Sequence, residues 1–427
     1  MIYRTSDVDL LLELGPLVET RWRKSDYSET LFPEIAAQTL TETALHSRVD
    51  PWQVIRWLET STQLPRQVDL EGNFGNPPIT LYDGSRFHIS LYFWVNGTTT
   101  IHQHAFAGAF QVLLGSSIHS HYTFKIDRAI NAHFQTGQLT LEESDLLVKG
   151  DVREIIPGSR YIHSLFHLDR PSVSLIIRTH QSPSGLPQYN YLRPFIAFDP
   201  FFREPAMTRK KQAVELLLGI AHPETDSLIS DFVRSSDFQT TFLLLEKTYE
   251  YLCGKDLPNG QDLSKNSGRF HALIEKARER HGVLVDLLVP VYQEQQRQLE
   301  IVKRRANLKS KDQRFFLALL LNVPDRKSLL KLVKQRFPDR DPIHVMLDRV
   351  SELSSMRGPA ESNILGINDF DDDYLFVYRC LLQDLTDQQI KENLKNEYKP
   401  EDATRIETRF DSLCGVLRNS NLLRSSL

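Results

Sequence analysis

Hydrophobic positions near the N-terminus recur with the period of a helix. Asp50, a residue type that caps helices, is followed by Pro51 at the position of a first helical turn. Val54 and Leu58 then follow at helical spacing, so that they share one face. We therefore predict a helical N-terminal segment over residues 1–65.

A period of two replaces the helical period in the middle of the chain. After Phe87, the apolar residues Ile89, Leu91 and Phe93 alternate with a more polar set, which is typical of a strand. Many short runs of this kind, separated by glycines, indicate a β-sandwich or barrel over residues 66–182. The predicted strands are 87–94, 99–104, 109–114, 118–124, 144–149, 159–166 and 173–179.

Helical patterning returns in the second half of the chain. A stretch rich in proline and aromatic residues, 183–206, is predicted as a linker, and amphipathic stretches dominate residues 207–427. Three of these stretches share a helix, a turn with Pro or Asp, and a second helix, at uneven spacing. A helical-repeat array and an ordinary helical bundle both stay open. The predicted fold class is multidomain α+β, with a central β-sandwich or barrel, a short helical N-terminal segment and a large all-α C-terminal domain.

Composition narrows the class of protein. The chain has 427 residues, of which 41% are hydrophobic and 25% charged, as in soluble globular proteins. A net charge of −4 argues against a surface built for nucleic acid or an anionic membrane. The longest apolar run, Phe315–Leu321, is far shorter than the roughly 20 residues that cross a bilayer. Cys253, Cys380 and Cys414 are too few and too scattered for a disulfide framework, so we expect a cytoplasmic protein.

One local cluster of basic residues stands out against this nearly balanced charge. Lys303, Arg304 and Arg305 are followed by Lys309, Lys311 and Arg314, with acidic residues on both sides. We interpret the cluster as a solvated helix face rather than a nucleic-acid footprint.

Two histidines in the β-region have the spacing of metal ligands. His102 and His104 lie two residues apart, and on a strand both imidazoles project from the same face. Two neutral imidazoles placed in this way form half of a site for a divalent ion. The alternative is a polar sheet face, because threonines precede the pair.

A second segment, from Gly150 to His163, lies downstream and also contains spaced glycines and a histidine. Together the two segments resemble the two motifs of the cupin superfamily; here they read G-x4-HxH-x3-G-x6-G and G-x6-PG-x4-H-x3-H. The resemblance covers residues 66–182. It implies a cupin-type β-barrel whose metal ligands are His102, His104 and His163.

Within the cupins, the pattern is similar to that of the three-histidine thiol dioxygenases of the cysteine dioxygenase type. Gly108 stands where most cupins carry a ligand glutamate, and the run from Pro171 to Leu175 (PSVSL) is similar to one in that family. The resemblance implies an Fe(II) cofactor, with another divalent metal as the alternative. It also implies open coordination positions for dioxygen and for a small anionic substrate such as a thiol.

The candidate substrate-binding residues depart from that family. Of its Ser-His-Tyr set only Ser174 matches, and the other two positions hold Ile176 and Arg178. Because no arginine matches the family's upstream carboxylate-binding residue, Arg178 is our candidate for that role. Tyr92 lies on the strand face opposite Leu91 and is a candidate to wall a cavity, with aromatic core packing as the alternative.

Three further histidines are candidate catalytic residues that orient the substrate. His167 shares a strand face with His163, and it is a direct ligand, a donor to the ligands or a surface residue. His119 and His121 form a second HxH pair, which either lines the pocket as acid and base groups or faces solvent.

These features favour a cytoplasmic, non-haem Fe(II) cupin oxygenase that adds dioxygen to a small metal-coordinating substrate. The alternative is a degenerate cupin joined to a helical-repeat scaffold, which binds a small molecule or a protein partner without turnover. In a third interpretation the helical part closes over the barrel, with Pro187–Pro205 as the lid. We expect neither a nucleic-acid nor a membrane partner.

Overall fold

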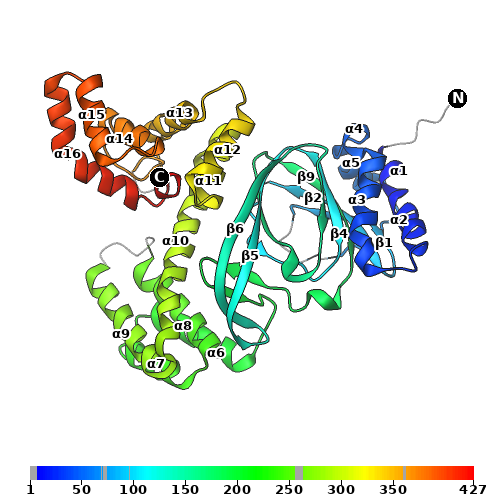
Figure 1. Cartoon of the computed structure of the whole chain (residues 1–427). Coiled ribbons are helices and arrows are strands. Elements are labelled where there is room, and N and C mark those ends of the chain that lie inside the picture. The colour runs from blue at the N-terminus through cyan, green and yellow to red at the C-terminus, as the bar shows by residue number, and fades with distance from the viewer. Residues whose placement is uncertain (1–6, 69, 71–74, 96, 255–262, 359–361) are drawn as a thin grey trace. The chain divides into compact units, whose positions relative to one another are not determined.

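The computed structural model describes residues 7–68, 70, 75–95, 97–254, 263–358 and 362–427. Helices come first along the chain, strands follow and helices return, as predicted (Figure 1). The chain forms two compact units, the first of residues 1–123, 141–186 and 301–427, the second of 124–140 and 187–300. The region predicted as one helical domain, 207–427, is therefore divided between the two units.

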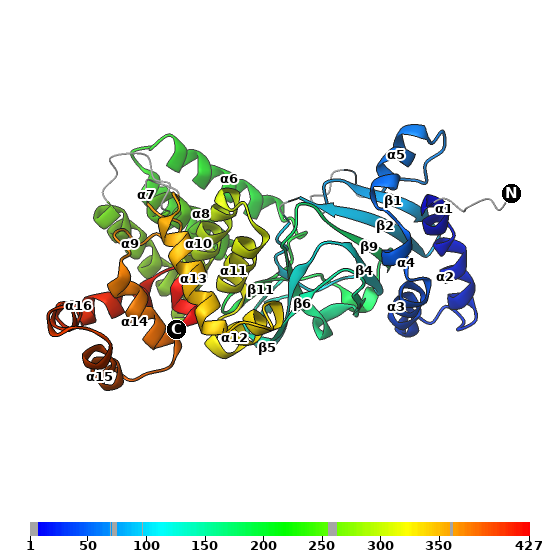
Figure 2. The same cartoon turned by 90° about the horizontal axis from the view of Figure 1, so that it is seen from above.

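Five N-terminal helices cover one face of a sheet in the first unit (Figures 1 and 2). Leu11, Val18 and Phe32 project from these helices and join Ile89 and Leu91 of the sheet in one buried core. Burial of such side chains drives the packing, at about 1.5–3 kcal/mol for each large apolar side chain. The helices are α1 (Asp7–Leu12), α2 (Leu14–Arg23), α3 (Phe32–Thr43), α4 (Leu45–Arg48) and α5 (Trp52–Thr60).

The covered sheet is antiparallel, with the strand order β1-β2-β9-β4-β7. The predicted strand 87–94 is confirmed, and its apolar face contacts the helices. The residues on the opposite face of β2 are buried as well, except Trp94, which is partly buried. The strands are β1 (Pro78–Asp83), β2 (Phe87–Trp94), β4 (Gly108–Leu114), β7 (Val152–Ile155) and β9 (Ser172–Thr179).

A second set of strands closes into a barrel in the order β10-β11-β6-β5-β8-β3. It confirms the predicted barrel but differs from the predicted strands in two ways. The hairpin strands β5 and β6 are much longer than predicted, and the predicted strand 99–104 is reduced to β3. The strands are β3 (Ile101–His102), β5 (Ser117–Asn131), β6 (Phe134–Leu147), β8 (Ile162–His167), β10 (Asn190–Leu192) and β11 (Ile196–Phe198).

The long hairpin escapes prediction because the outer part of β5 is largely exposed. From Lys125 onward most residues of β5 are exposed, so no hydrophobic alternation marks the strand. Pairing with other strands and burial of Phe134 at the start of β6 hold this part in place. In the second unit β6 pairs with β11, and β11 pairs with β10. Both partner strands lie in segment 183–206, where the sequence predicts only a linker.

The second unit completes its core with helices. Phe134 and Ile196 from its strands are buried together with Phe238, Phe242 and Tyr292. The hydroxyl of Tyr292 donates a hydrogen bond to the Phe242 carbonyl oxygen at 2.8 Å. The helices in this part of the chain are α6 (Pro205–Gly219), α7 (Thr225–Ser235), α8 (Phe238–Cys253), α9 (Leu263–His281) and α10 (Leu288–Arg304).

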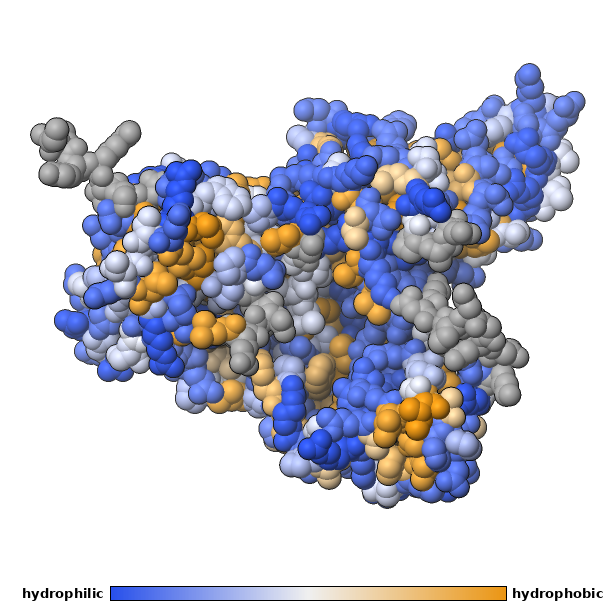
Figure 3. All heavy atoms as spheres, turned by 180° about the vertical axis from the view of Figure 1, so that it is seen from behind, coloured by the Kyte–Doolittle hydropathy of each residue, from blue (hydrophilic) through white to orange (hydrophobic). Residues whose placement is uncertain are grey.

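The C-terminal helices belong to the first unit. The apolar run Phe315–Leu321 is buried within α11, and no helix in the described ranges is long and apolar enough to cross a membrane. On the face seen in Figure 3, apolar residues gather in separate patches among hydrophilic ones. The helices are α11 (Lys311–Asn322), α12 (Arg326–Arg336), α13 (Pro342–Ser355), α14 (Asp372–Leu382), α15 (Asp387–Glu397) and α16 (Pro400–Asn419).

The three sequence stretches with a shared pattern each form two helices joined by a short turn. They correspond to α6–α7, α11–α12 and α14–α15. The first pair lies in the second unit and the other two in the first unit. The stretches therefore share local structure, while a continuous helical-repeat array stays a prediction.

Arg305 joins the C-terminal region to the barrel within the first unit. Its guanidinium donates to the Gly97 carbonyl oxygen at 2.9 Å and to Thr98 Oγ1 at 2.8 Å, and also to the His167 carbonyl oxygen. The same group lies 4.4 Å from the ring centroid of Phe166. A fork of donors on one rigid plane is needed to reach all three acceptors at once.

We predict that Arg305→Met destabilises the first unit, because three carbonyl or hydroxyl acceptors lose their charged donor. Hydrogen bonds to charged groups are worth roughly 1.5–3 kcal/mol each, and we expect a net loss of about 2–4 kcal/mol in the free energy of unfolding. Denaturant midpoints provide the measurement. Arg56→Met, on the exposed face of α5, is the matched control and should change the midpoint little. Equal midpoints for both variants would contradict the role of Arg305.

Candidate metal centre

Three buried histidines lie close together among the strands of the first unit. They are His102 at the end of β3, His104 just beyond it and His163 in β8. One ring nitrogen of each lies within 4.8 Å of the others. Of the described residues, these are the ones that form a group able to hold a metal ion. The three predicted ligands are therefore brought together.

Strand pairing positions two of the three ligands. His102 of β3 lies directly opposite His163 of β8, so their side chains are cross-strand neighbours. His163 also lies opposite His121 of β5. The position of His163 is thus determined by hydrogen-bonded ladders on both sides of β8.

A loop, rather than a strand, positions His104. Because β3 ends at His102, the alternation predicted for a continuous strand does not apply to His104. Its carbonyl oxygen accepts a hydrogen bond from the amide of Gly158 at 2.9 Å. Gly185 approaches the same oxygen so closely that a Cβ atom at residue 185 would lie 2.6 Å from it. Close backbone contacts therefore turn the His104 ring back toward the other two.

Hydrogen bonds select the nitrogen that each ring presents. His102 Nδ1 lies 2.8 Å from the Thr100 carbonyl oxygen, which only accepts, so Nδ1 carries the proton and Nε2 is left for a ligand bond. His104 Nε2 lies 2.8 Å from His163 Nε2. Two ligand nitrogens bound side by side at roughly 2.1 Å from one ion would be about 3 Å apart. The donor set therefore fits a divalent metal.

A second layer of residues supports His163. When its Nε2 serves as a ligand, its Nδ1 carries the proton and donates to His119 Nε2, 2.9 Å away. The Tyr161 hydroxyl lies 3.3 Å from the same His119 nitrogen. His119, predicted as a catalytic residue, therefore lies behind the three candidate ligands. Tyr161 was missed by our sequence analysis, although its spacing of two residues before His163 is a signal for the same strand face.

His121 lies further out in this layer. Its ring is 4.2 Å from the His119 ring and 5.2 Å from the Tyr161 ring, measured between centroids. Unlike His119, it is only partly buried. His121 is therefore neither fully buried nor fully exposed, and its role as an acid or base group stays a prediction.

Burial keeps the histidines uncharged. Burial lowers the pKa of His102. Burial, followed by repulsion from neighbouring histidines, lowers the pKa of His104 and of His163 well below the ordinary value. All three rings are therefore neutral at neutral pH, which is the form in which an imidazole can serve as a metal ligand. Burial also raises the pKa of Tyr161, so its phenol stays protonated.

Close packing of β9 leaves no room for a side chain at Gly108. A Cβ atom at this residue would lie 2.1 Å from the Ile177 carbonyl oxygen and 2.9 Å from the Arg178 Cα atom. Among the described residues, the group able to hold a metal ion consists of three histidines without a carboxylate.

Arg178 is separated from the candidate ligand His104 by the ring of Phe106. Its guanidinium is 3.8 Å from the ring centroid of Phe106, and that ring is 4.3 Å from the His104 ring. Burial is the main cause that lowers the pKa of His104. Repulsion from His102 and then from the positive charge of Arg178 lowers it further. The predicted substrate-binding arginine is therefore close enough for its charge to act on the centre.

The remaining three predicted residues lie together but not among the ligands. Tyr92 stacks on Trp94, and Trp94 stacks on His167, with centroid distances of 5.6 and 4.6 Å. Trp94 Nε1 donates to Ser174 Oγ at 2.8 Å. His167 is four residues beyond His163 on β8, about 13 Å along an extended strand. The side chain of His167 is thus placed in a separate cluster.

Neither a protein-family model nor a curated protein matches this chain. The chemistry of the centre therefore has to be inferred from its own residues.

We predict that Gly185→Ala weakens metal binding without unfolding the protein, because the added methyl group pushes the His104 backbone away. Displacing one of three ligands should cost roughly tenfold or more in affinity. Competition with a coloured chelator provides the measurement. Gly219→Ala is the matched control, since a Cβ atom there meets nothing within 4 Å. The proposed position of His104 would be wrong if both variants bound metal as tightly as the unaltered chain.

Proposed function

We propose that this chain is a cupin-type, non-haem Fe(II) oxygenase that acts on a small anionic substrate such as a thiol. The observation that carries the proposal is a buried set of three neutral imidazoles in a β-barrel, without a carboxylate among them. Such a set leaves the full charge of a divalent ion uncompensated by the protein. An anionic substrate would restore the charge balance on binding.

His102, His104 and His163 would hold the ion. A bound Fe(II) ion would supply the capacity to react with dioxygen, and it would lower the pKa of a coordinating thiol. With a thiol, both oxygen atoms of one dioxygen molecule would end on sulfur, giving a sulfinate and one proton.

The other residues of the centre would orient ligands and manage protons. His119 would hold the His163 ring through the hydrogen bond at Nδ1. Tyr161, which burial keeps protonated, would hold a hydroxyl donor beside His119. Arg178, held on the Phe106 ring, would bind a carboxylate of the substrate.

We predict near-stoichiometric iron in protein purified without a histidine tag. His102→Ala and His163→Ala should both lose it, because two nitrogens bind a divalent ion much more weakly than three. Elemental mass spectrometry provides the measurement. His344→Ala, a largely exposed histidine in α13, is the matched control and should keep the metal.

Each other result of this experiment has a defined meaning. Zinc that is lost in the same two variants would keep the metal centre but contradict the dioxygen chemistry, because zinc has no redox chemistry. Nickel or manganese lost in the same way would keep the centre and contradict iron as its metal. A folded protein that is metal-free and takes up no added Fe(II) would contradict the centre itself. The degenerate barrel that binds a partner or small molecule without turnover would then be the better account.

We predict that Arg178→Ala raises KM for a thiol that carries a carboxylate by roughly tenfold or more, because a charge-assisted contact is lost. For cysteamine, which has no carboxylate, KM should change little. Oxygen uptake with cysteine and with cysteamine provides the comparison. Equal changes for both thiols would assign Arg178 to the packing of Phe106 instead of to substrate binding.

A further inference from the structure

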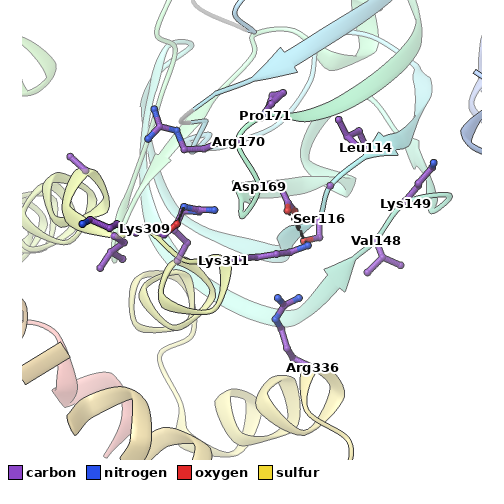
Figure 4. Close-up of a pocket in the computed structure, with 14 residues that line it drawn as sticks. Leu114, Ser116, Val148, Lys149, Asp169, Arg170, Pro171, Lys309, Lys311 and Arg336 are labelled. Carbon is purple, nitrogen blue, oxygen red and sulfur yellow. Dashed lines mark hydrogen bonds and ion pairs between the residues drawn. The ribbon is translucent and has the colours of Figure 1, made fainter. Parts of the chain in front are cut away.

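An open pocket of about 960 Å³ lies in the first unit, on the side of the barrel that meets α11 and α12 (Figure 4). Its walls come from the turn after β4, the end of β6, the turn after β8 and the segment that leads into α11. None of the histidines of the metal centre lines it. The pocket is therefore a separate candidate site, and a ligand bound there would not depend on the proposed oxygenase activity.

The pocket is strongly basic. Among its fourteen lining residues, all of them in the described ranges, Asp169 is the one acid. Basic side chains reach it from the barrel and from both helices. The basic lining residues are Lys149, Arg170, Lys309, Lys311, Arg314 and Arg336.

Asp169 already has partners for both carboxylate oxygens. Ser116 Oγ donates to one oxygen at 2.8 Å, and Lys311 Nζ lies 3.0 Å from the other. Figure 4 shows Lys311 extending from α11 toward this pair, while Arg336 approaches from α12. Asp169 therefore neutralises one cation, Lys311.

Two of the arginines, Arg314 and Arg336, are held in place by hydrogen bonds to the protein. Arg314 is buried and donates to the Leu168 carbonyl oxygen at 2.6 Å and to the Lys309 carbonyl oxygen at 3.1 Å. Arg336 donates to Asp312 at 2.9 Å, and its Nε is a buried donor without a partner among the described residues. The prediction that the basic cluster is a solvated helix face is therefore wrong for Arg314, because this side chain is buried and bonded to two carbonyl oxygens.

The other three cations have no counter-charge. In the part of the chain that the structure describes, the side chains of Lys149, Arg170 and Lys309 make no hydrogen bond or ion pair, and all three are exposed. Burial lowers the pKa of Arg314, and repulsion from Arg170 adds to this effect. The folded chain thus holds like charges together around a concave surface.

We propose that this pocket binds a small molecule that carries two or more phosphate groups. Arginine matches phosphate oxygens with two parallel hydrogen bonds, while lysine contributes a mobile point charge. A single phosphate would neutralise only part of the charge that remains once Lys311 is paired with Asp169 and Arg336 with Asp312. The volume is that of a site for a ligand of nucleotide size, since ligand pockets measure roughly 300–1,000 Å³.

The observations favour a small molecule over a nucleic-acid strand. The chain as a whole has a net charge of −4, so the basic residues of the pocket are a local exception. They surround one concavity instead of following a groove. The first turn of α11, with Lys311, adds the positive end of a helix dipole to the same wall.

The test is isothermal titration calorimetry of the full chain with sodium tripolyphosphate at about 0.15 M salt. We expect saturable binding that is roughly tenfold tighter or more than binding of citrate, a carboxylate anion of similar size. Arg170→Ala and Lys309→Ala should each weaken binding of tripolyphosphate by roughly tenfold, because each removes one charge-assisted contact. Both side chains are exposed, so circular dichroism should show an unchanged fold.

Lys24→Ala, an exposed lysine at the end of α2, is the control for loss of one positive charge and should bind as the unaltered chain does. The proposal is overturned if the chain does not bind tripolyphosphate, if citrate binds equally well, or if the double variant R170A/K309A binds as tightly as the unaltered chain. Tighter binding of a single-stranded oligonucleotide than of tripolyphosphate would assign the pocket to nucleic acid instead.

Discussion

The candidate metal centre depends on the pairing of β3 with β8. This ladder is very short, yet it sets His102 opposite His163 and so establishes the distance between two of the three ligands. The pairing of β8 with β5 on its other side places His119 behind His163. Any shift of register in β8 by one residue would turn His163 to the opposite face of the sheet.

A second constraint acts through the absence of side chains. At Gly108 the backbone of β9 comes so near that even a methyl group has no room, and at Gly185 the His104 carbonyl oxygen is similarly close. The first contact leaves no room for a side chain at this position of β4, and the second holds the loop that carries His104. The position of the His104 loop is thus a consequence of how tightly the turns approach one another.

The C-terminal helices of the first unit are connected to the barrel through arginines. Arg305 and Arg314 donate to backbone oxygens of the turns that follow β8 and precede β3. Because these guanidinium groups are buried between the barrel and α11, they also place the first turn of α11 beside the basic pocket. One set of contacts therefore joins the two parts and shapes a second candidate site.

The sequence by itself determined the order of helices, strands and helices, the strand 87–94 and the identity of the three candidate ligands. The first two follow from the helical and period-two patterns of hydrophobic residues, which are local signals, and the ligands follow from an HxH pair together with the resemblance to the cupin motifs. Only the tertiary structure decided that His119 supports His163, that His104 is held by a loop, and that Tyr92, Ser174 and His167 lie in another cluster. It also decided the length of β5 and β6, because the outer part of β5 is mostly exposed and β6 is extended by its pairing with β11. Strand register and close backbone packing bring together side chains that are far apart in the chain. The local pattern of residues predicts neither the register nor the packing.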